Sequence, residues 1–422
     1  MSYRTVKADS ETVRRQNRHL ILDRVRRHGS VSRTWLAAST QLSSATISAI
    51  TGDLIAEGAL IEARGKRPAG TPRGRPQVRL KLNPDFARVV GVLASVEEIG
   101  VVVADYSGAT VASRKTSIAG ARLGARETVE AIAGEIEAAL ATENIPLDTV
   151  RRQVVAVQGI VDASRQRLLW TPFSTVRDIN LAEPLGARLG VPTSVVNDCA
   201  TMVEGLHWAE PDRYSGDFVV VLVGCGVGMG LYLNGRNFSG WRSSAAELGH
   251  TIHRPEGALC RCGRHGCIEA YSGDYAIWRT ANGLDPKTNP AFINPSAEEM
   301  ADLASRARAG DDAALLAFRD AGTALGHGLA RVFALVDPRK IVFTGTGMPY
   351  FDLLEPHIRK GYDDGLVEAL FYPLEFDLVA DETALVFKGT VMDALSALDR
   401  DISRAAHASA VPAADRNASS LS

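Results

Sequence analysis

The hydrophobic positions of the first sixty residues have the spacing of three short helices. The first is expected over residues 11–28, the second over 33–38, and the third from Ser43 to Glu57. Ser32 and Ser43 stand where an N-cap side chain is needed, so each can satisfy a free backbone N–H at a helix start. The third helix would bury the apolar side chains that share one of its faces: Ile47, Ile50 and Leu54.

The opposite face of the third helix carries only small residues: Ala45, Ser48, Ala49 and Gly52. Two segments that alternate like the strands of a wing follow, over residues 60–63 and 78–82. This order predicts a winged helix-turn-helix over residues 1–82, and its small outward face would let the third helix enter the major groove of DNA. The helical residues expected to contact DNA are Arg33, Ser43, Ser44, Ala45, Thr46 and Ser48.

The segment between the two wing strands is rich in glycine, proline and cationic side chains. Arg67, Arg73 and Arg75 are expected to contact the minor groove or the phosphates, because narrow A/T-rich grooves attract cations. The alternative is a solvated linker whose charge is incidental. The three-helix pattern directly before the loop favours DNA binding.

From residue 89 the pattern changes to that of an α/β protein. The first half is expected to contain strands over 89–93, 101–105, 110–118, 154–159 and 194–198, and a helix over 127–143. The pattern then restarts with a strand over 218–223, a hairpin over 229–236, a helix over 325–335 and a strand over 340–347. Two similar halves predict a duplicated α/β body with lobes over 83–200 and 201–399, and a cleft between such lobes suits a small molecule.

The charge of the chain is divided unevenly between these parts. The 422 residues are 45% hydrophobic and 23% charged, as in an ordinary globular protein of two or three domains. Residues 1–81 carry 16 Lys and Arg against 6 Asp and Glu, a charge of +10; since the whole chain carries −2, the remainder carries −12. A basic head on an acidic body indicates a polyanion partner for the head alone.

The location of the protein is also constrained by its composition. No window is apolar enough for a membrane helix, and the N-terminus lacks the apolar core of a signal peptide. Five cysteines, mostly clustered, do not indicate a disulfide framework, and they favour a reducing cytoplasm. The residues after Asp399 are rich in Ala and Ser, so the segment 400–422 is expected to be a disordered tail.

Three cysteines and one histidine have the chemistry of a metal site. The candidate ligands are His250, Cys260, Cys262 and Cys267. Thiolates and a neutral imidazole suit tetrahedral Zn²⁺, and four protein ligands would close its coordination sphere. We therefore predict one structural zinc ion per chain, which leaves the neighbouring carboxylates free for another role.

A second group of polar residues is expected in the cleft: Asn197, Asp198, Glu247, His250 and Glu269. A sugar needs several convergent donors and acceptors, because each unpaired buried polar group costs roughly 1–3 kcal/mol. Carboxylates that accept from adjacent hydroxyls, together with one amide, suit such a ligand. The alternative is that Asn197 and Asp198 cap a helix beginning at Cys199, and the two roles can coexist.

At this point the residues resemble a known family. The motifs that carry the likeness are Gly224-Cys225-Gly226-Val227-Gly228, Asn234-Gly235-Arg236, Glu247-Leu248-Gly249-His250, the cysteine cluster ending in Glu269, and Gly74-Arg75-Pro76. From about residue 11 to 398 the chain resembles the ROK family (repressors, open reading frames and kinases), in particular its sugar-responsive repressors with an N-terminal winged helix. The resemblance implies a duplicated actin-like, ribonuclease H-like sugar-kinase fold, with the zinc and sugar contacts at the candidate positions given above.

The chain departs from the kinases of that family where they bind ATP. Their first lobe opens with Asp-x-Gly-Gly-Thr, whose glycines let backbone N–H groups reach the phosphates. Here Leu93 replaces the aspartate and Ser95-Val96 replaces the glycine pair, while Glu97 and Glu98 would repel phosphate.

Two further departures concern the other glycine turns and the sugar site. Cys225 stands where a hydroxyl is usual, and the turn over residues 344–347 has lost one glycine. Gln158 and Phe173 stand where the sugar kinases commonly have Pro and Asn. Asp198 matches the general base of the kinases, but without a phosphate donor it is expected only to accept a hydrogen bond from the effector.

These features predict a non-enzymatic, DNA-binding transcriptional regulator, most simply a repressor, whose cleft binds a small carbohydrate. Sugar would close the lobes and re-space the paired heads of a homodimer or homotetramer on operator DNA, with helices around residues 313–336 at the dimer contact. One alternative is an active sugar kinase with a DNA-binding head. The other is a ligand-independent repressor whose body only oligomerises or binds a partner protein.

Overall fold

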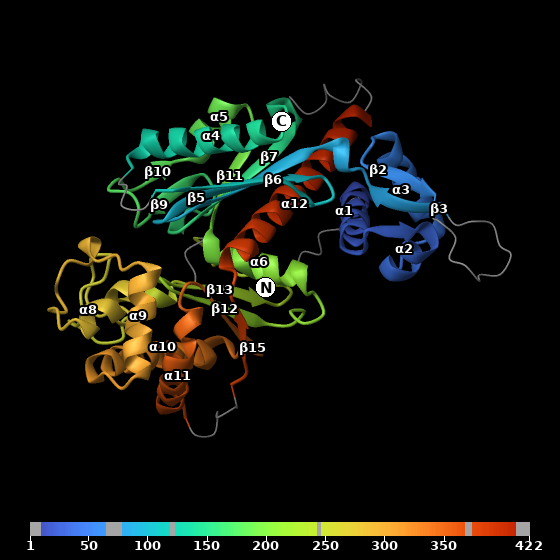
Figure 1. Cartoon of the computed structure of the whole chain (residues 1–422). Coiled ribbons are helices and arrows are strands. Elements are labelled where there is room, and N and C mark those ends of the chain that lie inside the picture. The colour runs from blue at the N-terminus through green and yellow to red at the C-terminus, as the bar shows by residue number, and fades with distance from the viewer. Residues whose placement is uncertain (1–9, 65–77, 119–122, 243–245, 368–373, 411–422) are drawn as a thin grey trace, which may run out of the picture.

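The computed structural model describes residues 10–64, 78–118, 123–242, 246–367 and 374–410. These residues form a small head followed by two lobes, with the last helix running between the sheet of the first lobe and α6 and meeting the head toward its C-terminal end (Figure 1). None of the helices in this part of the chain is long and apolar enough to span a membrane.

The head contains three helices and a three-stranded antiparallel sheet. Its elements are α1 (Ser10–His28), β1 (Ser30–Ser32), α2 (Arg33–Thr40), α3 (Ser44–Ala56), β2 (Leu60–Arg64) and β3 (Val78–Leu82), with sheet order β1-β3-β2. Ser32 Oγ accepts from the Trp35 N–H and Ser43 Oγ from the Thr46 N–H, each at 3.1 Å, so both predicted N-caps are present. The predicted helix and strand segments therefore form, and β1 is an additional short strand.

The first lobe is a five-stranded mixed sheet covered on both faces. Its main elements are β4 (Arg88–Ala94), β5 (Glu98–Asp105), β6 (Thr110–Ser117), α4 (Ala125–Thr142), β7 (Val150–Val157), α5 (Ala182–Leu189) and β11 (Thr193–Asn197). The strand order is β11-β7-β4-β5-β6, with β4–β5–β6 antiparallel and β4, β7 and β11 parallel. A small sheet of β8 (Ile160–Val161), β9 (Arg167–Trp170) and β10 (Ile179–Asn180) lies beside it.

The second lobe repeats this topology. Its main elements are α6 (Asp198–Ala209), β12 (Phe218–Val223), β13 (Val227–Leu233), β14 (Arg236–Asn237), α7 (Glu269–Ser272), α8 (Asp274–Ala281), α9 (Ala297–Arg308), α10 (Asp312–Val336), β15 (Lys340–Thr344), α11 (Phe351–Gly365) and β16 (Phe376–Val379). The order β14-β13-β12-β15-β16 matches that of the first lobe strand for strand, again with one antiparallel and one parallel side. The expected duplication is thus confirmed by the topology.

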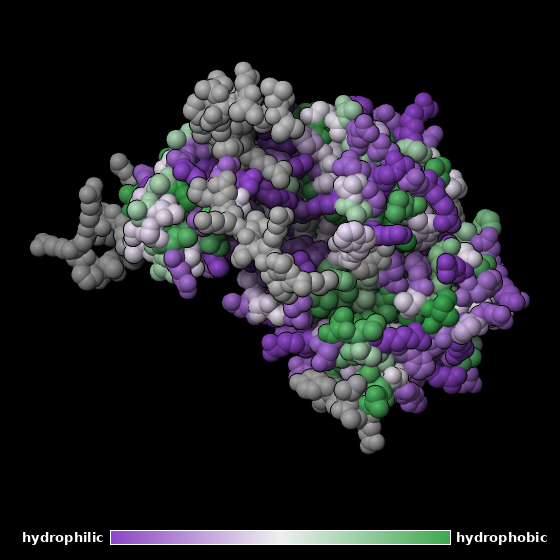
Figure 2. Space-filling model, turned by 180° about the vertical axis from the view of Figure 1, so that it is seen from behind, coloured by the Kyte–Doolittle hydropathy of each residue, from purple (hydrophilic) through white to green (hydrophobic). Residues whose placement is uncertain are grey.

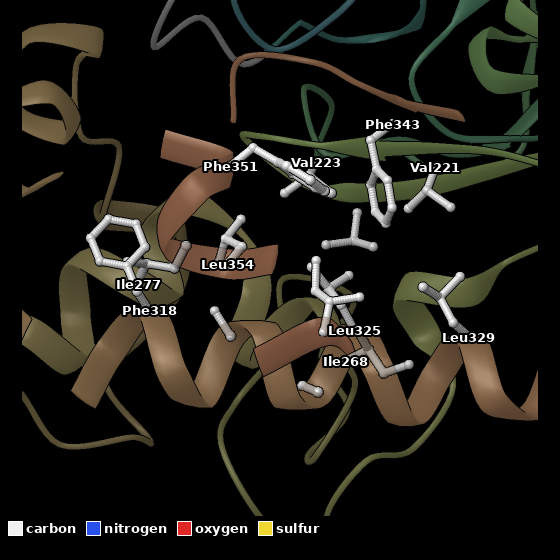
Figure 3. Close-up of a cluster of buried hydrophobic side chains, with 14 of the residues drawn as sticks. Val221, Val223, Ile268, Ile277, Phe318, Leu325, Leu329, Phe343, Phe351 and Leu354 are labelled. Carbon is white, nitrogen blue, oxygen red and sulfur yellow. The ribbon is translucent and has the colours of Figure 1, made fainter. Parts of the chain in front are cut away.

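The core of the second lobe lies between this sheet and the α7–α11 helices. In Figure 3, Val221, Val223 and Phe343 point from the strands toward Leu325 and Leu329 of α10. All of these side chains are fully buried. Because helices cover the sheet, its central strands are continuous apolar runs instead of alternating ones.

The last helix corrects two sequence-based boundaries. Helix α12 (Glu382–Ala410) runs past residue 400, so the predicted disordered tail does not begin there, although residues 411–422 lie outside the described chain. The helix also packs against β4, β7 and α6 and reaches α1 (Figure 1). Its first turns share a core with strands of both lobes, so it is not confined to the second lobe, to which the range 201–399 had assigned it. The physical reason is burial, because its apolar side chains join the head core: Val391, Met392, Ala394, Leu395 and Leu398.

Candidate functional site

The loop that carries the cysteines is folded by two tight turns. The Gly263 N–H donates to the Cys260 carbonyl and the Cys260 N–H donates to the Arg264 carbonyl, both at 2.9 Å. Gly263 has φ +87° and Gly266 has φ +83°, a region that side chains other than glycine rarely adopt. At Gly266 a Cβ would also lie only 1.8 Å from a carbonyl oxygen. These turns bring the thiols together.

The four predicted metal ligands converge on one point. The ligand atoms of His250, Cys260, Cys262 and Cys267 all lie within 4.8 Å of one another. Cys262 Sγ and Cys267 Sγ are 3.7 Å apart, as are Cys260 Sγ and His250 Nδ1. A tetrahedron with Zn–S bonds of about 2.3 Å has edges of about 3.8 Å, whereas a disulfide needs about 2.05 Å. The side chains therefore fit a tetrahedral metal ion.

Asn197 and Asp198 stand at the junction between β11 and α6. Asn197 is the N-cap of α6: its Oδ1 accepts from the Ala200 N–H at 3.1 Å, and its Nδ2 donates to the Gly159 carbonyl at 3.0 Å. The capping alternative is therefore realised, beginning one residue earlier than expected. Asp198 is buried, and this burial raises its pKa to about 6.

The carboxylates on either side of the cysteine loop face the same place. Glu269 Oε2 accepts from the Val227 N–H at 3.3 Å, and its Oε1 lies 3.5 Å from Cys260 Sγ. Burial raises the pKa of Glu247 to about 7. One pocket between the lobes is lined by all five residues of the expected ligand site: Asn197, Asp198, Glu247, His250 and Glu269. The structure thus places three carboxyl groups, an amide and an imidazole around one small space.

Two further residues of the pocket, which were not among the predicted ligand residues, make specific contacts there. Trp170 of β9 contacts His250 edge to face, with ring centroids 5.4 Å apart. Arg261, between two of the cysteines, donates to the Cys225 carbonyl at 2.9 Å, and both side chains line the pocket. Arg261 was already next to the cluster in the sequence. Trp170 approaches only through packing between the lobes and gave no signal.

On the other side of the cleft, the positions that hold phosphate in kinases contact one another. Cys225 Sγ lies 2.7 Å from Glu97 Oε1, across the two lobes. Burial, reinforced by the carboxylates of Asp274 and Glu97, raises the pKa of the Cys225 thiol, which therefore donates to Glu97. The cavity left here has a volume of about 80 Å³ and is lined by Glu97, Glu98 and Glu382. These carboxylates disfavour the phosphates of a nucleotide in this space.

The head exposes part of the predicted DNA surface. On α3, Ser44, Ala45 and Ser48 are exposed, as are Ala49 and Gly52, while Thr46 is half-buried. Ser43 is exposed and used as the cap. Arg33, in contrast, pairs with Glu62 at 3.0 Å and donates to Thr51 Oγ1 at 3.1 Å, so its guanidinium is engaged within the head. The predicted loop contacts lie outside the described residues: Arg67, Arg73 and Arg75.

A comparison with protein-family models matches residues 89–384 to the ROK family. The chain belongs to the ROK family. A xylose repressor from Bacillus subtilis is 23% identical over 79% of this chain and 83% of its own length. The DNA-binding transcriptional dual regulator NagC of Escherichia coli is 24% identical over 79% of this chain and 81% of its own.

Solved structures share the ROK fold with this chain. A ROK family transcriptional regulator described as a homologue of the Escherichia coli MLC protein has a TM-score of 0.73 and 21% identity, covering 92% of this chain and 99% of its own. A ROK family glucokinase from Streptomyces griseus, in complex with glucose and AMPPNP, has a TM-score of 0.56 and 25% identity over 72% of this chain and 99% of its own. The actin-like sugar-kinase fold is therefore common to regulators and kinases of the family.

Proposed function

We propose that this chain is a sugar-responsive transcriptional repressor whose kinase-like body has no catalytic activity. The observation that carries the proposal is the cleft, where three carboxyl groups, an amide and an imidazole converge on one pocket, while three glutamates line the space at the glycine turns. The relatives named xylose repressor and DNA-binding transcriptional dual regulator NagC support the same proposal. Residues 1–82 would bind operator DNA, and the two lobes would bind a small carbohydrate.

The arrangement of the head supports a winged helix-turn-helix. Helices α2 and α3 are joined by a short turn at Gln41, which has φ 60°, and β2 pairs antiparallel with β3 as a wing would. The exposed face of α3 carries only small side chains, which would allow close approach to the base edges of the major groove. We infer that α3 is the recognition helix, and that the loop over residues 65–77 adds minor-groove or phosphate contacts.

We propose that the cysteine cluster holds one structural zinc ion per chain. Three thiolates and one imidazole would fill all four positions, so the ion has no open position for catalysis. His250 and Glu269 flank the cluster and line the pocket, so a bound ion would fix both side chains relative to each other. The zinc ion would then keep this edge of the sugar pocket rigid.

We propose that α12 transmits the effect of sugar binding from the cleft to the head. This helix begins at the glycine turns, where Glu382 lines the cavity, and its other end packs against α1. Arg26 of α1 donates to Asp399 of α12 at 2.8 Å, and Tyr106 donates to the same carboxylate at 2.7 Å. A change in the angle between the lobes would move α6 against α12 and thereby reorient the head on DNA.

We infer that the protein forms a homo-oligomer, as two operator half-sites require. Figure 2 shows apolar surface on the rear of the second lobe, whereas the rear of the first lobe is largely hydrophilic. Large apolar side chains exposed on the second lobe include Leu335 of α10, which is 83% exposed, and Val367, which is 68% exposed. Contiguous apolar surface of this kind favours a protein contact, and α10 is the helix proposed for it.

The proposal is tested with operator fragments selected from genomic DNA by the purified chain. Fluorescence anisotropy would follow the release of such a fragment as single sugars are added. We expect one carbohydrate to release the DNA, and Asp198→Asn to abolish the release while leaving DNA affinity unchanged. If the DNA stays bound with every sugar, the body is an oligomerisation or partner-binding platform instead. Transfer of phosphate from ATP to a sugar would establish a kinase.

A further inference from the structure

A second, larger cavity adjoins the proposed sugar pocket. Its volume is about 870 Å³, within the range of about 300–1,000 Å³ that is typical of small-molecule sites, whereas the inner pocket measures about 50 Å³. The two share four lining residues: Trp170, Pro172, Cys225 and Arg261. The inner pocket therefore adjoins the outer cavity, and Trp170 stands at the boundary between them.

The lining of the outer cavity has the character of a carbohydrate subsite. The half-exposed ring of Trp170 meets polar groups there, since Asn289 and Asn294 are exposed in the lining, while Phe173 and Tyr275 lie buried in the wall behind it. Tyr275 also connects the two spaces, because its hydroxyl donates to Glu269 Oε1 at 3.4 Å. Aromatic rings can stack against the apolar C–H faces of a sugar ring while amides pair with its hydroxyls.

The charges of the outer cavity disfavour a phosphorylated ligand. Three carboxylates line it (Glu97, Glu98 and Asp274), against two guanidinium groups. One of these, Arg261, is already engaged: it donates to the Cys225 carbonyl, to the Ile293 carbonyl and to Asn294 Oδ1, and its guanidinium lies 4.4 Å from the Tyr275 ring centroid. Because Lys115 also pairs with Glu98 at 3.3 Å, a phosphate dianion would compete for cations that are already engaged with protein groups.

We propose that the effector is a neutral glycoside of at least two units, with one sugar in the inner pocket and the next across Trp170 in the outer cavity. This inference rests on the proposed function, because it assigns the ligand class of the same cleft. The second unit adds contacts with Asn289 and Asn294, which line the outer cavity alone and which a monosaccharide in the inner pocket does not reach. A disaccharide therefore binds more tightly than its own component monosaccharide, and more tightly than that monosaccharide's 6-phosphate.

The test is a calorimetric titration of the full chain with matched sugars. The probes are glucose, xylose and N-acetylglucosamine, the disaccharides cellobiose, xylobiose and chitobiose, and glucose 6-phosphate and N-acetylglucosamine 6-phosphate. Thr175 is exposed and lines the outer cavity without touching the inner pocket, so Thr175→Trp fills only the outer space. Val176 is its exposed neighbour outside the lining, so Val176→Trp is the matched control.

We expect one disaccharide to bind at least about ten-fold more tightly than its monosaccharide, the difference of about 1.4 kcal/mol that a modest set of new contacts supplies. Thr175→Trp should remove this advantage and keep the monosaccharide affinity, and Val176→Trp should keep both. A monosaccharide or sugar phosphate that binds best, or a disaccharide advantage that survives Thr175→Trp, would overturn the inference and leave the sugar-sensing function standing. If no sugar binds, the proposed function fails as well.

Discussion

Arg26 of the first helix and Asp399 of the last helix form a buried ion pair, with Nη1 and Oδ2 2.8 Å apart and both side chains almost fully enclosed. Tyr106 of the first lobe donates to the same carboxylate. The head is thus tied to the body by a polar contact inside an apolar core, so the two cannot separate without breaking this buried ion pair.

Asp399→Ala should destabilise the protein strongly. Removal of one partner leaves the Arg26 guanidinium buried without a counter-charge, which typically costs about 3–5 kcal/mol. Urea unfolding, followed by circular dichroism, would measure the loss. The control is Asp401→Ala, which removes the more exposed Arg152–Asp401 pair and should cost no more than about 1 kcal/mol. Equal losses for the two variants would show that the buried pair has no special role.

Cys262→Ser should release the proposed zinc ion and loosen the sugar pocket. We expect zinc content, measured by elemental analysis, to fall from one ion per chain to well below one, and sugar affinity to fall with it. Cys225→Ser removes a thiol outside the cluster and should keep the full zinc content. Undiminished zinc in the Cys262 variant would contradict the ligand set, and unchanged sugar affinity after zinc loss would contradict the rigidifying role.

Asp198→Asn should stabilise the protein near neutral pH. Burial raises the pKa of Asp198 from 3.8 to about 6. Between these values the folded chain holds a proton that the unfolded chain has lost, so stability falls as the pH rises through this window. The variant avoids this loss, which is worth up to about 3 kcal/mol. Its melting temperature should exceed that of the wild type at pH 7, and the gap should narrow at pH 4; a gap independent of pH would refute the assignment.

ATP with Mg²⁺ should leave the melting temperature unchanged. Glu97, Glu98 and Glu382 line the cavity at the glycine turns and would repel any phosphate placed there. A sugar that binds should shift the transition in the same assay, since a ligand at a hundred times its dissociation constant adds about 2.7 kcal/mol. A ROK glucokinase serves as the positive control for ATP. A shift with ATP alone would reopen the kinase reading.

Ser48→Glu should abolish operator binding without loss of stability. Ser48 is exposed on α3, so a new carboxylate there would face the phosphates and base edges of the major groove. Ala56→Glu adds the same charge at an exposed position at the other end of the helix and should weaken binding much less. Both variants would be compared by electrophoretic mobility shift and by thermal melting. Equal binding by the two would exclude this face of α3 as the DNA surface.

Local signals in the sequence were sufficient for the head. Ser43 is a good N-cap, and Ile47, Ile50 and Leu54 recur at helical spacing, so the start and the buried face of α3 could both be predicted. The same holds for the candidate metal site, because Cys260, Cys262 and Cys267 lie within a few residues of one another and metal chemistry restricts what they can do.

Contacts between distant segments could not be predicted in the same way. The end of helix α12 has the Ala-rich composition of a disordered tail. The helix is held by the packing of its preceding residues against the head and the first lobe. Trp170 meets His250 only because β9 and the cysteine loop face each other across the cleft. Glu97 was expected to repel phosphate, but its contact with Cys225 depends on how far the lobes close.

The course of α12 makes the second lobe an insertion within the first. The chain leaves the first lobe through α6 and returns to it through α12, and these two helices pack directly against each other. The head and the first lobe thus form one continuous body, and a pair of adjacent helices connects the second lobe to it. Any motion of the second lobe must bend these two helices or slide one along the other. The stiffness of the pair therefore determines how far closure of the cleft moves the DNA-binding head.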